Sequence, residues 1–262
     1  FLLKLKDYTA MFLAVFLRYY PGWALSQGQK VLYMRDPNLL RYFGLQREGQ
    51  KWLRDWILIY ESHDPLGHDP NEFEDGDPYR NDPDILKAAA NFDIFICNTQ
   101  ALADDLRIWS MGGLNPYVIT LASPLKRLEK PPQINFGEKI TLGYIGTIDT
   151  LRGVDMLLDS IRLLPQEVKV RLVGRFRREV GVDPDWLLKY TQDPKIQDKL
   201  DLILTEHITD VAGEIDQCDI LIQPASQNIL DSRYATPQKA YGYMVRGKPI
   251  LVGDVPCHHE LF

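Results

Sequence analysis

Cysteine is scarce in this sequence. Its 262 residues include three cysteines, Cys97, Cys218 and Cys257, and no two of them have C-x-x-C spacing. An odd number of widely separated cysteines does not build a disulfide framework. It predicts buried, reduced thiols in a reducing compartment, so we expect a cytoplasmic protein.

An excess of basic residues is also absent. The chain has 30 Lys and Arg against 36 Asp and Glu, which gives a formal net charge of -6. This charge argues against a nucleic-acid partner, and any anion site must be local. His258 and His259 are adjacent rather than spaced as metal ligands on one helix face, so we expect no metal site and no cofactor. The G-x-S-x-G, H-E-x-x-H and Walker A patterns do not occur.

No apolar run is both long and uncharged enough to predict a membrane span. The most apolar stretch, residues 1–20, contains Lys4, Lys6, Asp7 and Arg18, and its apolar residues recur at helical spacing. This pattern is typical of an amphipathic helix. Such a helix either packs on a core or lies on a membrane surface, so peripheral membrane contact stays open. The oligomeric state stays open as well.

Short runs rich in Ile, Leu and Val alternate with helical patterns along the rest of the chain. Runs of this composition are typical of strands covered on both faces. Their repetition with intervening helices predicts an α/β protein with parallel, doubly wound sheets. The apolar stripe of one such helix consists of Val154, Leu157, Leu158, Ile161 and Leu164. The predicted strands are residues 30–35, 56–61, 93–98, 117–122, 140–146, 168–174, 200–206, 219–224 and 249–254.

A polar stretch with three prolines, residues 123–139, divides the strands into two series. Segments of this composition often join domains. We therefore predict an N-terminal domain at 1–125, a linker at 126–138 and a C-terminal domain at 139–262.

Two short motifs in the C-terminal half favour an anion site. In GTIDTLRG (146–153), a strand ends at Gly146 and a helix begins near Gly153, so helix N–H groups and Arg152 could meet a phosphate. In TPQK (236–239), Thr236 suits the helix N-cap and Pro237 the first helical position. Lys239 in the first turn opposes the helix dipole, which a bound anion would explain. An ordinary strand-to-helix turn and a solvated lysine are the structural alternatives.

A third motif, IYESHDP (59–65), follows a predicted strand. Ligands in open α/β sheets bind beyond the carboxyl ends of strands, which places His63 near a ligand. A histidine used only in packing is the alternative.

These motifs together resemble the GT-B glycosyltransferases, most closely family 4, the retaining group that includes mannosyl- and glucosyltransferases. The matching segments also include DIFICNTQALADDLR (93–107), LGYIGTIDTLRGVDMLLDSIRLLPQEVKVRLVGR (142–175) and DILIQPASQNILDSRYATPQKAYGYMVRGKPILVGD (219–254). The resemblance implies two Rossmann-like domains, with the acceptor on the first and the nucleotide sugar on the second. It also implies that the chain lacks the family's opening strand and its last helix, so we expect the N-terminal domain to be incomplete and the chain truncated at both ends.

The resemblance assigns roles residue by residue. The donor-phosphate site would comprise Gly146, Thr147, Arg152, Thr236, Pro237 and Lys239, and the catalytic residues would be His63, Arg152 and Lys239. The nucleotide-sugar cleft would also contain Glu61, Gly174, Arg175 and Gly242.

The sequence departs from the family at four positions. Arg152 replaces a lysine of the phosphate loop and keeps its charge, whereas Thr147 replaces an arginine and loses one. Ala235 and Gly242 stand where we place the two glutamates of the family's Glu-x7-Glu arrangement, of which the first lies near the sugar and the second binds the nucleotide ribose.

The resemblance implies a retaining, metal-independent hexosyltransferase that uses a nucleoside diphosphate sugar as donor substrate. The acceptor, whether lipid-linked, a glycan or a small molecule, stays open. The missing glutamates motivate a second hypothesis, a non-catalytic glycosyltransferase-like binding subunit. A third is a nucleotide-sugar epimerase that would use Glu61 and Asp64 as acid and base.

Overall fold

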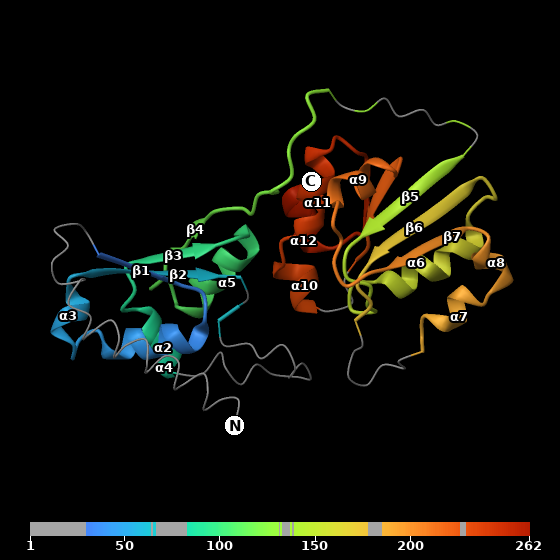
Figure 1. Ribbon diagram of the computed structural model, residues 1–262. Coiled ribbons are helices and arrows are strands. Elements are labelled where there is room, and N and C mark those ends of the chain that lie inside the picture. Colours follow the sequence, from blue (N-terminus) through green and yellow to red (C-terminus); the bar gives the residue numbers. More distant parts are fainter. Residues whose placement is uncertain are drawn as a thin grey trace. The chain divides into compact units, whose positions relative to one another are not determined.

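The computed structural model describes residues 30–63, 65–66, 83–130, 132, 137, 139–177, 185–225 and 229–262. The amphipathic segment 1–20 and Asp64 lie outside these residues. The chain divides into two compact units, residues 1–120 and 121–262. Each unit has its own parallel sheet (Figure 1).

The first unit contains a four-stranded parallel sheet whose strands follow chain order, β1-β2-β3-β4. Its helices α2 and α4 pack closely enough that a Cβ on Gly44 would stand 2.3 Å from the carbonyl oxygen of Ala88. Asp36 caps α2 by accepting from the N–H of Asn38 at 2.8 Å. The elements are β1 (Lys30–Met34), α2 (Pro37–Gln46), α3 (Lys51–Arg54), β2 (Trp56–Ser62), α4 (Pro83–Ala89), β3 (Ile94–Cys97), α5 (Gln100–Trp109) and β4 (Tyr117–Val118).

The second unit contains a five-stranded parallel sheet of order β7-β6-β5-β8-β9 (Figure 1). From β5 the chain proceeds to β6 and β7 on one side, and then returns to add β8 and β9 on the other. The order therefore reverses between β5 and β8. The elements are β5 (Ile140–Ile145), α6 (Val154–Ser160), the 3₁₀ helix η2 (Ile161–Leu163), β6 (Val168–Gly174), α7 (Leu188–Thr191), α8 (Pro194–Gln197), β7 (Leu200–Leu204), α9 (Val211–Asp216), β8 (Ile220–Gln223), α10 (Ile229–Tyr234), α11 (Gln238–Val245), β9 (Ile250–Val252) and α12 (Pro256–Leu261).

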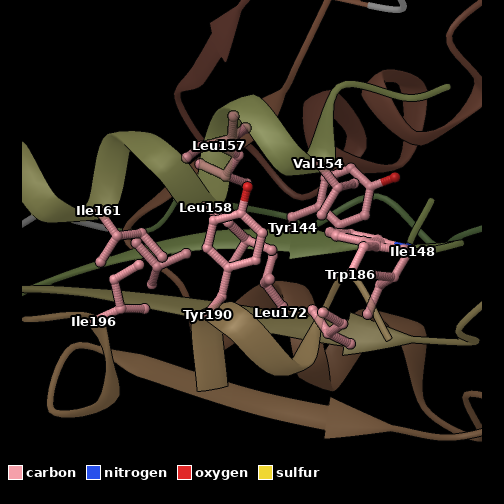
Figure 2. Close-up of a cluster of buried hydrophobic side chains, with 13 residues drawn as sticks. Tyr144, Ile148, Val154, Leu157, Leu158, Ile161, Leu172, Trp186, Tyr190 and Ile196 are labelled. Atoms are coloured by element: carbon pink, nitrogen blue, oxygen red, sulfur yellow. The ribbon is translucent and has the colours of Figure 1, made fainter. Parts of the chain in front are cut away.

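Two apolar clusters hold this second sheet. One packs the predicted stripe of α6 and η2 against the sheet and against Trp186, Tyr190 and Ile196, as Figure 2 shows. The other includes Ile145, Ile215 and Tyr243, which come from β5, α9 and α11. Apolar residues thus lie on both sides of the sheet, which is why its strands read as continuous apolar runs in the sequence.

The fold confirms the prediction of parallel α/β sheets, but two sequence expectations differ from the structure. The predicted strand at 117–122 is paired only over Tyr117–Val118, and Ile119 adds a single hydrogen bond to the carbonyl of Cys97 at 2.8 Å. Beyond this point the backbone leaves the sheet. The polar stretch after it packs on α11, because Leu125 joins the second apolar cluster and Leu128 donates to the carbonyl of Val245. Its first part thus belongs to the second unit.

The three cysteines are free and buried. Burial raises the pKa of the Cys97 thiol to about 12 and that of Cys218 to about 11. Both groups are therefore protonated thiols at neutral pH, which makes them poor nucleophiles and gives them a packing role.

Candidate functional site

A cavity of about 490 Å³ lies in the second unit at the carboxyl ends of β5 and β8. This is where the strand order reverses, the place at which doubly wound sheets leave a crevice for a ligand. Residues from four segments line it: Gly146, Thr147, Arg152, Gln223, Pro224, Ala235, Thr236, Pro237, Gln238, Lys239, Cys257 and His258. The structure thus brings both sequence motifs, more than 80 residues apart, to one cavity.

The first wall is the loop between β5 and α6. Gly153 caps α6 in the left-handed conformation, with φ +69°, and a Cβ there would stand 2.2 Å from the carbonyl oxygen of Ala225. Glycine is therefore required here because a side chain would collide with the backbone of Ala225. The motif had suggested instead that the glycine lets a ligand approach the backbone. The loop brings Arg152 to the cavity, with a third of its side chain exposed.

A buried carboxylate positions Arg152. Asp149 has no exposed surface, accepts from the Arg152 backbone N–H at 3.0 Å, and forms an ion pair with the Arg152 guanidinium. A buried charge of this kind is stable only when paired, so the pair fixes the loop and the direction of the guanidinium. Sequence reasoning missed Asp149. Its position three residues before Arg152 in a short loop is the signal that could have found it.

The second wall is the start of α11. Lys239 lies in its first turn and extends across Gly146, where a Cβ would stand 2.7 Å from the lysine Cε. Its ammonium donates to the Tyr144 hydroxyl at 2.8 Å and lies 4.4 Å from the centre of the Tyr144 ring. That hydroxyl in turn donates to the carbonyl of Thr147 at 2.6 Å. This chain of contacts connects the two motifs, and it also depends on Tyr144, which sequence reasoning assigned only to a strand.

The cap of α11 differs from the sequence expectation. Pro237, not Thr236, occupies the N-cap, the helix begins at Gln238, and no side chain caps it. The predicted assignment of Thr236 as the N-cap is therefore wrong by one residue. Thr236 lines the cavity instead, beside the first turn of the helix. The expected end is confirmed, because Gly247 has φ +65° and donates to the carbonyl of Met244.

The family resemblance implies that a nucleoside diphosphate binds here. We predict that Tyr144→Phe weakens its binding about three- to tenfold, because the substitution removes the hydroxyl that contacts both Lys239 and Thr147. Burial raises the pKa of the Tyr144 phenol, so the hydroxyl stays protonated and available to donate. Titration calorimetry with UDP measures the loss. The control is Tyr60→Phe, which removes a hydroxyl that donates to the Arg35 carbonyl in the first unit. An equal loss of affinity in both variants would contradict the prediction.

The third wall comes from β8 and α12. Gln223 ends β8, and His258 lies in α12 with 4% of its surface exposed. The imidazole Nδ1 lies 2.6 Å from the carbonyl oxygen of Gly253, and the N–H of Gly253 donates to the carbonyl of Gln223 at 2.9 Å. Sequence reasoning weighed His258 only as a metal ligand and did not consider Gln223.

Three residues expected at the nucleotide-sugar cleft do not line this cavity. A Cβ on Gly174 would stand 1.8 Å from the carbonyl oxygen of Gly146, so Gly174 permits close contact between β6 and the loop after β5. Arg175 is exposed beside it. Gly242 is buried in α11, and a Cβ there would stand 3.4 Å from Leu125 and 3.7 Å from Ile215. Gly242 therefore faces packed apolar side chains and not the cavity.

The spacing of the missing glutamates also needs a correction. Seven residues separate Tyr234 from Gly242, whereas six separate Ala235 from Gly242. In a Glu-x7-Glu arrangement the first position therefore falls on Tyr234, which is buried, and not on Ala235, which lines the cavity. Neither assignment supplies a carboxylate.

The remaining expected residues, Glu61 and His63, lie in the first unit at the end of β2. His63 Nε2 is 2.5 Å from Glu61 Oε1, and the Tyr33 hydroxyl donates to the other carboxylate oxygen. Both carboxylate oxygens of Glu61 are thus engaged. Asp64, the second member of the acid–base pair in the epimerase hypothesis, lies outside the described residues.

Among the residues that the structure describes, no three His, Cys, Asp or Glu side chains are grouped so that they could hold a metal ion. None of the helices in this part of the chain is long and apolar enough to cross a membrane.

Comparisons with known proteins agree with this architecture. Residues 139–262 match the family described as Glycosyl transferases group 1. A comparison of the sequence with curated proteins found no match. Among solved structures, Anabaena Alr3699/HepE in complex with UDP has a TM-score of 0.63 at 17% identity, over 89% of this chain and 62% of that one.

Two further solved structures share the fold. Sucrose-phosphate synthase from Thermosynechococcus elongatus has a TM-score of 0.61 at 16% identity, over 94% of this chain and 61% of that one. The α,α-trehalose-phosphate synthase (UDP-forming) from Burkholderia xenovorans, in complex with glucose-6-phosphate, has a TM-score of 0.58 at 13% identity, over 97% of this chain and 64% of that one. The chain spans about three fifths of the length of these proteins. It has the GT-B fold of glycosyltransferases, and its segment 139–262 carries the sequence pattern of glycosyl transferases group 1.

Proposed function

We propose that this chain contains the donor site of a glycosyltransferase that transfers a hexose from a nucleoside diphosphate sugar, with retention and without a metal ion. The observation that carries the proposal is the position of Arg152 and Lys239. Arg152 comes from the loop between β5 and α6 and Lys239 from the first turn of α11, yet both line one cavity at the point where the strand order reverses. Two cations beside the start of a helix form a site for a diphosphate.

In this proposal the diphosphate is the leaving group. Arg152 and Lys239 would stabilise the negative charge that develops on it as the bond to the sugar breaks, a role that a divalent ion often takes in other enzymes. Both cations are already held, Arg152 by Asp149 and Lys239 by Tyr144. Little reorganisation is then needed when the charge appears. His63, held by Glu61 on the first unit, would orient the donor sugar.

Two comparisons support a nucleotide sugar as the substrate. Alr3699/HepE was solved in complex with UDP-glucose as well as with UDP, and the Burkholderia enzyme is a UDP-forming synthase. The acceptor stays open between a lipid-linked molecule, a glycan and a small molecule.

The test is a panel of UDP-glucose, UDP-galactose and GDP-mannose, each incubated with the chain and assayed for release of the free nucleoside diphosphate. We expect one donor to be hydrolysed or transferred faster than the others, because a defined cavity selects one sugar. A copurifying nucleotide identified by mass spectrometry would name the base directly. No release and no calorimetric heat with any donor would contradict the proposal.

A non-catalytic binding subunit is the second candidate, and the absence of a glutamate at Tyr234 and Gly242 favours it. None of the described residues that line the cavity carries a carboxylate to bind a ribose or to contact a sugar. This candidate predicts that a protein partner is recovered in a pull-down, while the chain alone turns over no donor. Turnover by the purified chain would exclude it.

A further inference from the structure

The cavity that contains Arg152 and Lys239 also contains an unpaired hydrogen-bond acceptor. The Oε1 atom of Gln223 is buried and has no hydrogen-bond partner among the described residues. A buried acceptor without a partner lowers the stability of the fold. Gln223 lines the cavity, so a ligand hydroxyl can supply the missing donor once the Gln223 side chain rotates toward it.

His258 supplies a second acceptor to the same cavity. Its Nδ1 lies 2.6 Å from the carbonyl oxygen of Gly253, and a carbonyl oxygen can only accept. When the imidazole is neutral, its ring proton is therefore on Nδ1, and Nε2 carries the lone pair that can accept. The N–H of Gly253 also donates to the backbone carbonyl of Gln223, so Gly253 contacts both the Gln223 backbone and the His258 imidazole.

Two acceptors are the wrong groups for a diphosphate, whose oxygens are themselves acceptors. They suit hydroxyl groups, which donate. The cavity thus has a cationic part, with Arg152 and Lys239, and an accepting part, with Gln223 and His258. A ligand that satisfies both parts carries an anionic group next to several hydroxyls, which inorganic phosphate and pyrophosphate do not.

We infer that Gln223 and His258 bind hydroxyl groups of the donor sugar and determine which sugar the cavity accepts. The inference rests on the proposed function and extends it from the diphosphate to the sugar. Hydrogen bonds to substrate hydroxyls discriminate strongly, because a mismatched sugar leaves buried acceptors unpaired. Selectivity would then not require the missing glutamates.

The experiment compares the dissociation constants of UDP and UDP-glucose for the wild type, Gln223→Leu and His258→Asn. Leucine removes the acceptor with a similar side-chain volume. Asparagine can still donate to the Gly253 carbonyl in place of Nδ1, but it lacks an acceptor where Nε2 lies. We expect each variant to weaken UDP-glucose binding about five- to tenfold and to leave UDP binding within about twofold. In each variant, the dissociation constants of UDP-glucose and UDP-galactose should also differ by a smaller factor than in the wild type.

Arg152→Ala is the opposite control, because loss of a phosphate contact should weaken UDP and UDP-glucose alike. Equal weakening of both ligands by Gln223→Leu would overturn the inference, since the accepting side chains would then contact the nucleotide. No effect on either ligand would overturn it as well. A wild-type chain that binds neither ligand would overturn the proposed function itself. Thermal melting of each variant separates lost folding from lost binding, and His258→Gln, which can supply an acceptor near Nε2, should restore part of the UDP-glucose affinity.

Discussion

The double variant Arg152→Ala, Lys239→Ala should lower kcat/KM for the preferred nucleotide sugar about 100-fold or more. Each cation would form charge-assisted hydrogen bonds with the diphosphate, and each such bond contributes about 1.5–3 kcal/mol. Two losses together correspond to a factor of about 10² to 10⁴. Initial rates of nucleoside diphosphate release measure the effect, and normal turnover by this variant would disprove the phosphate-site assignment.

A structural side effect must be separated from this loss. Arg152→Ala leaves the carboxylate of Asp149 buried without its guanidinium, which would destabilise the loop whether or not a phosphate binds there. The triple variant that adds Asp149→Asn removes this uncompensated charge. It should recover thermal stability but not activity. The matched control is Arg162→Ala with Lys195→Ala, which removes one cation on η2 and one on α8, both outside the cavity. It should retain near wild-type turnover.

The single substitution with the largest expected effect on stability is Gly174→Ala. Its new Cβ would stand 1.8 Å from the carbonyl oxygen of Gly146 and 2.7 Å from the carbonyl carbon, and both are backbone atoms that cannot rotate away. The contact can be relieved only if β6 and the loop after β5 separate. We expect the second unit to lose about 3 kcal/mol or more of its free energy of unfolding, as measured by urea denaturation.

Separation of these two segments would also move Gly146 beneath Lys239, so nucleotide binding should fall together with stability. The control is Gly49→Ala in the first unit, where the nearest atom to the new Cβ is 3.8 Å away and no left-handed backbone is required. Gly49→Ala should change stability by less than about 0.5 kcal/mol. Similar urea midpoints of unfolding for Gly174→Ala and the wild type would contradict the prediction, because they would show that the loop after β5 accommodates the new side chain.

The arrangement of elements was largely predictable from the sequence. Strands buried on both faces need uninterrupted Ile, Leu and Val, and that composition marked the paired strands of both sheets, with the run at 117–122 paired only at its start. The stripe on α6 and η2 was predictable because helical periodicity places Val154, Leu158 and Ile161 on one face. The turn at Gly153 and the helix end at Gly247 were local signals as well, since glycine alone readily adopts positive φ.

Contacts between distant residues were not predictable. Lys239 meets Tyr144 across 95 residues of sequence, and this contact depends on which strands are neighbours and on their register. The same is true of Gly242, which a motif alignment placed in a cleft and which the structure places against Leu125 and Ile215. The N-cap of α11 moved by one residue because no side chain caps that helix to define its start.

By itself the sequence determined two series of parallel strands and two cationic motifs, because both follow from composition and local spacing. The family resemblance assigned both motifs to one phosphate site, but only the tertiary structure shows that they line one cavity. That outcome depends on the reversal of strand order between β5 and β8, which brings the ends of both connections together. The accepting side chains of Gln223 and His258 became visible for the same reason, since an unpaired atom and a fixed tautomer are properties of packed neighbours and not of residue type.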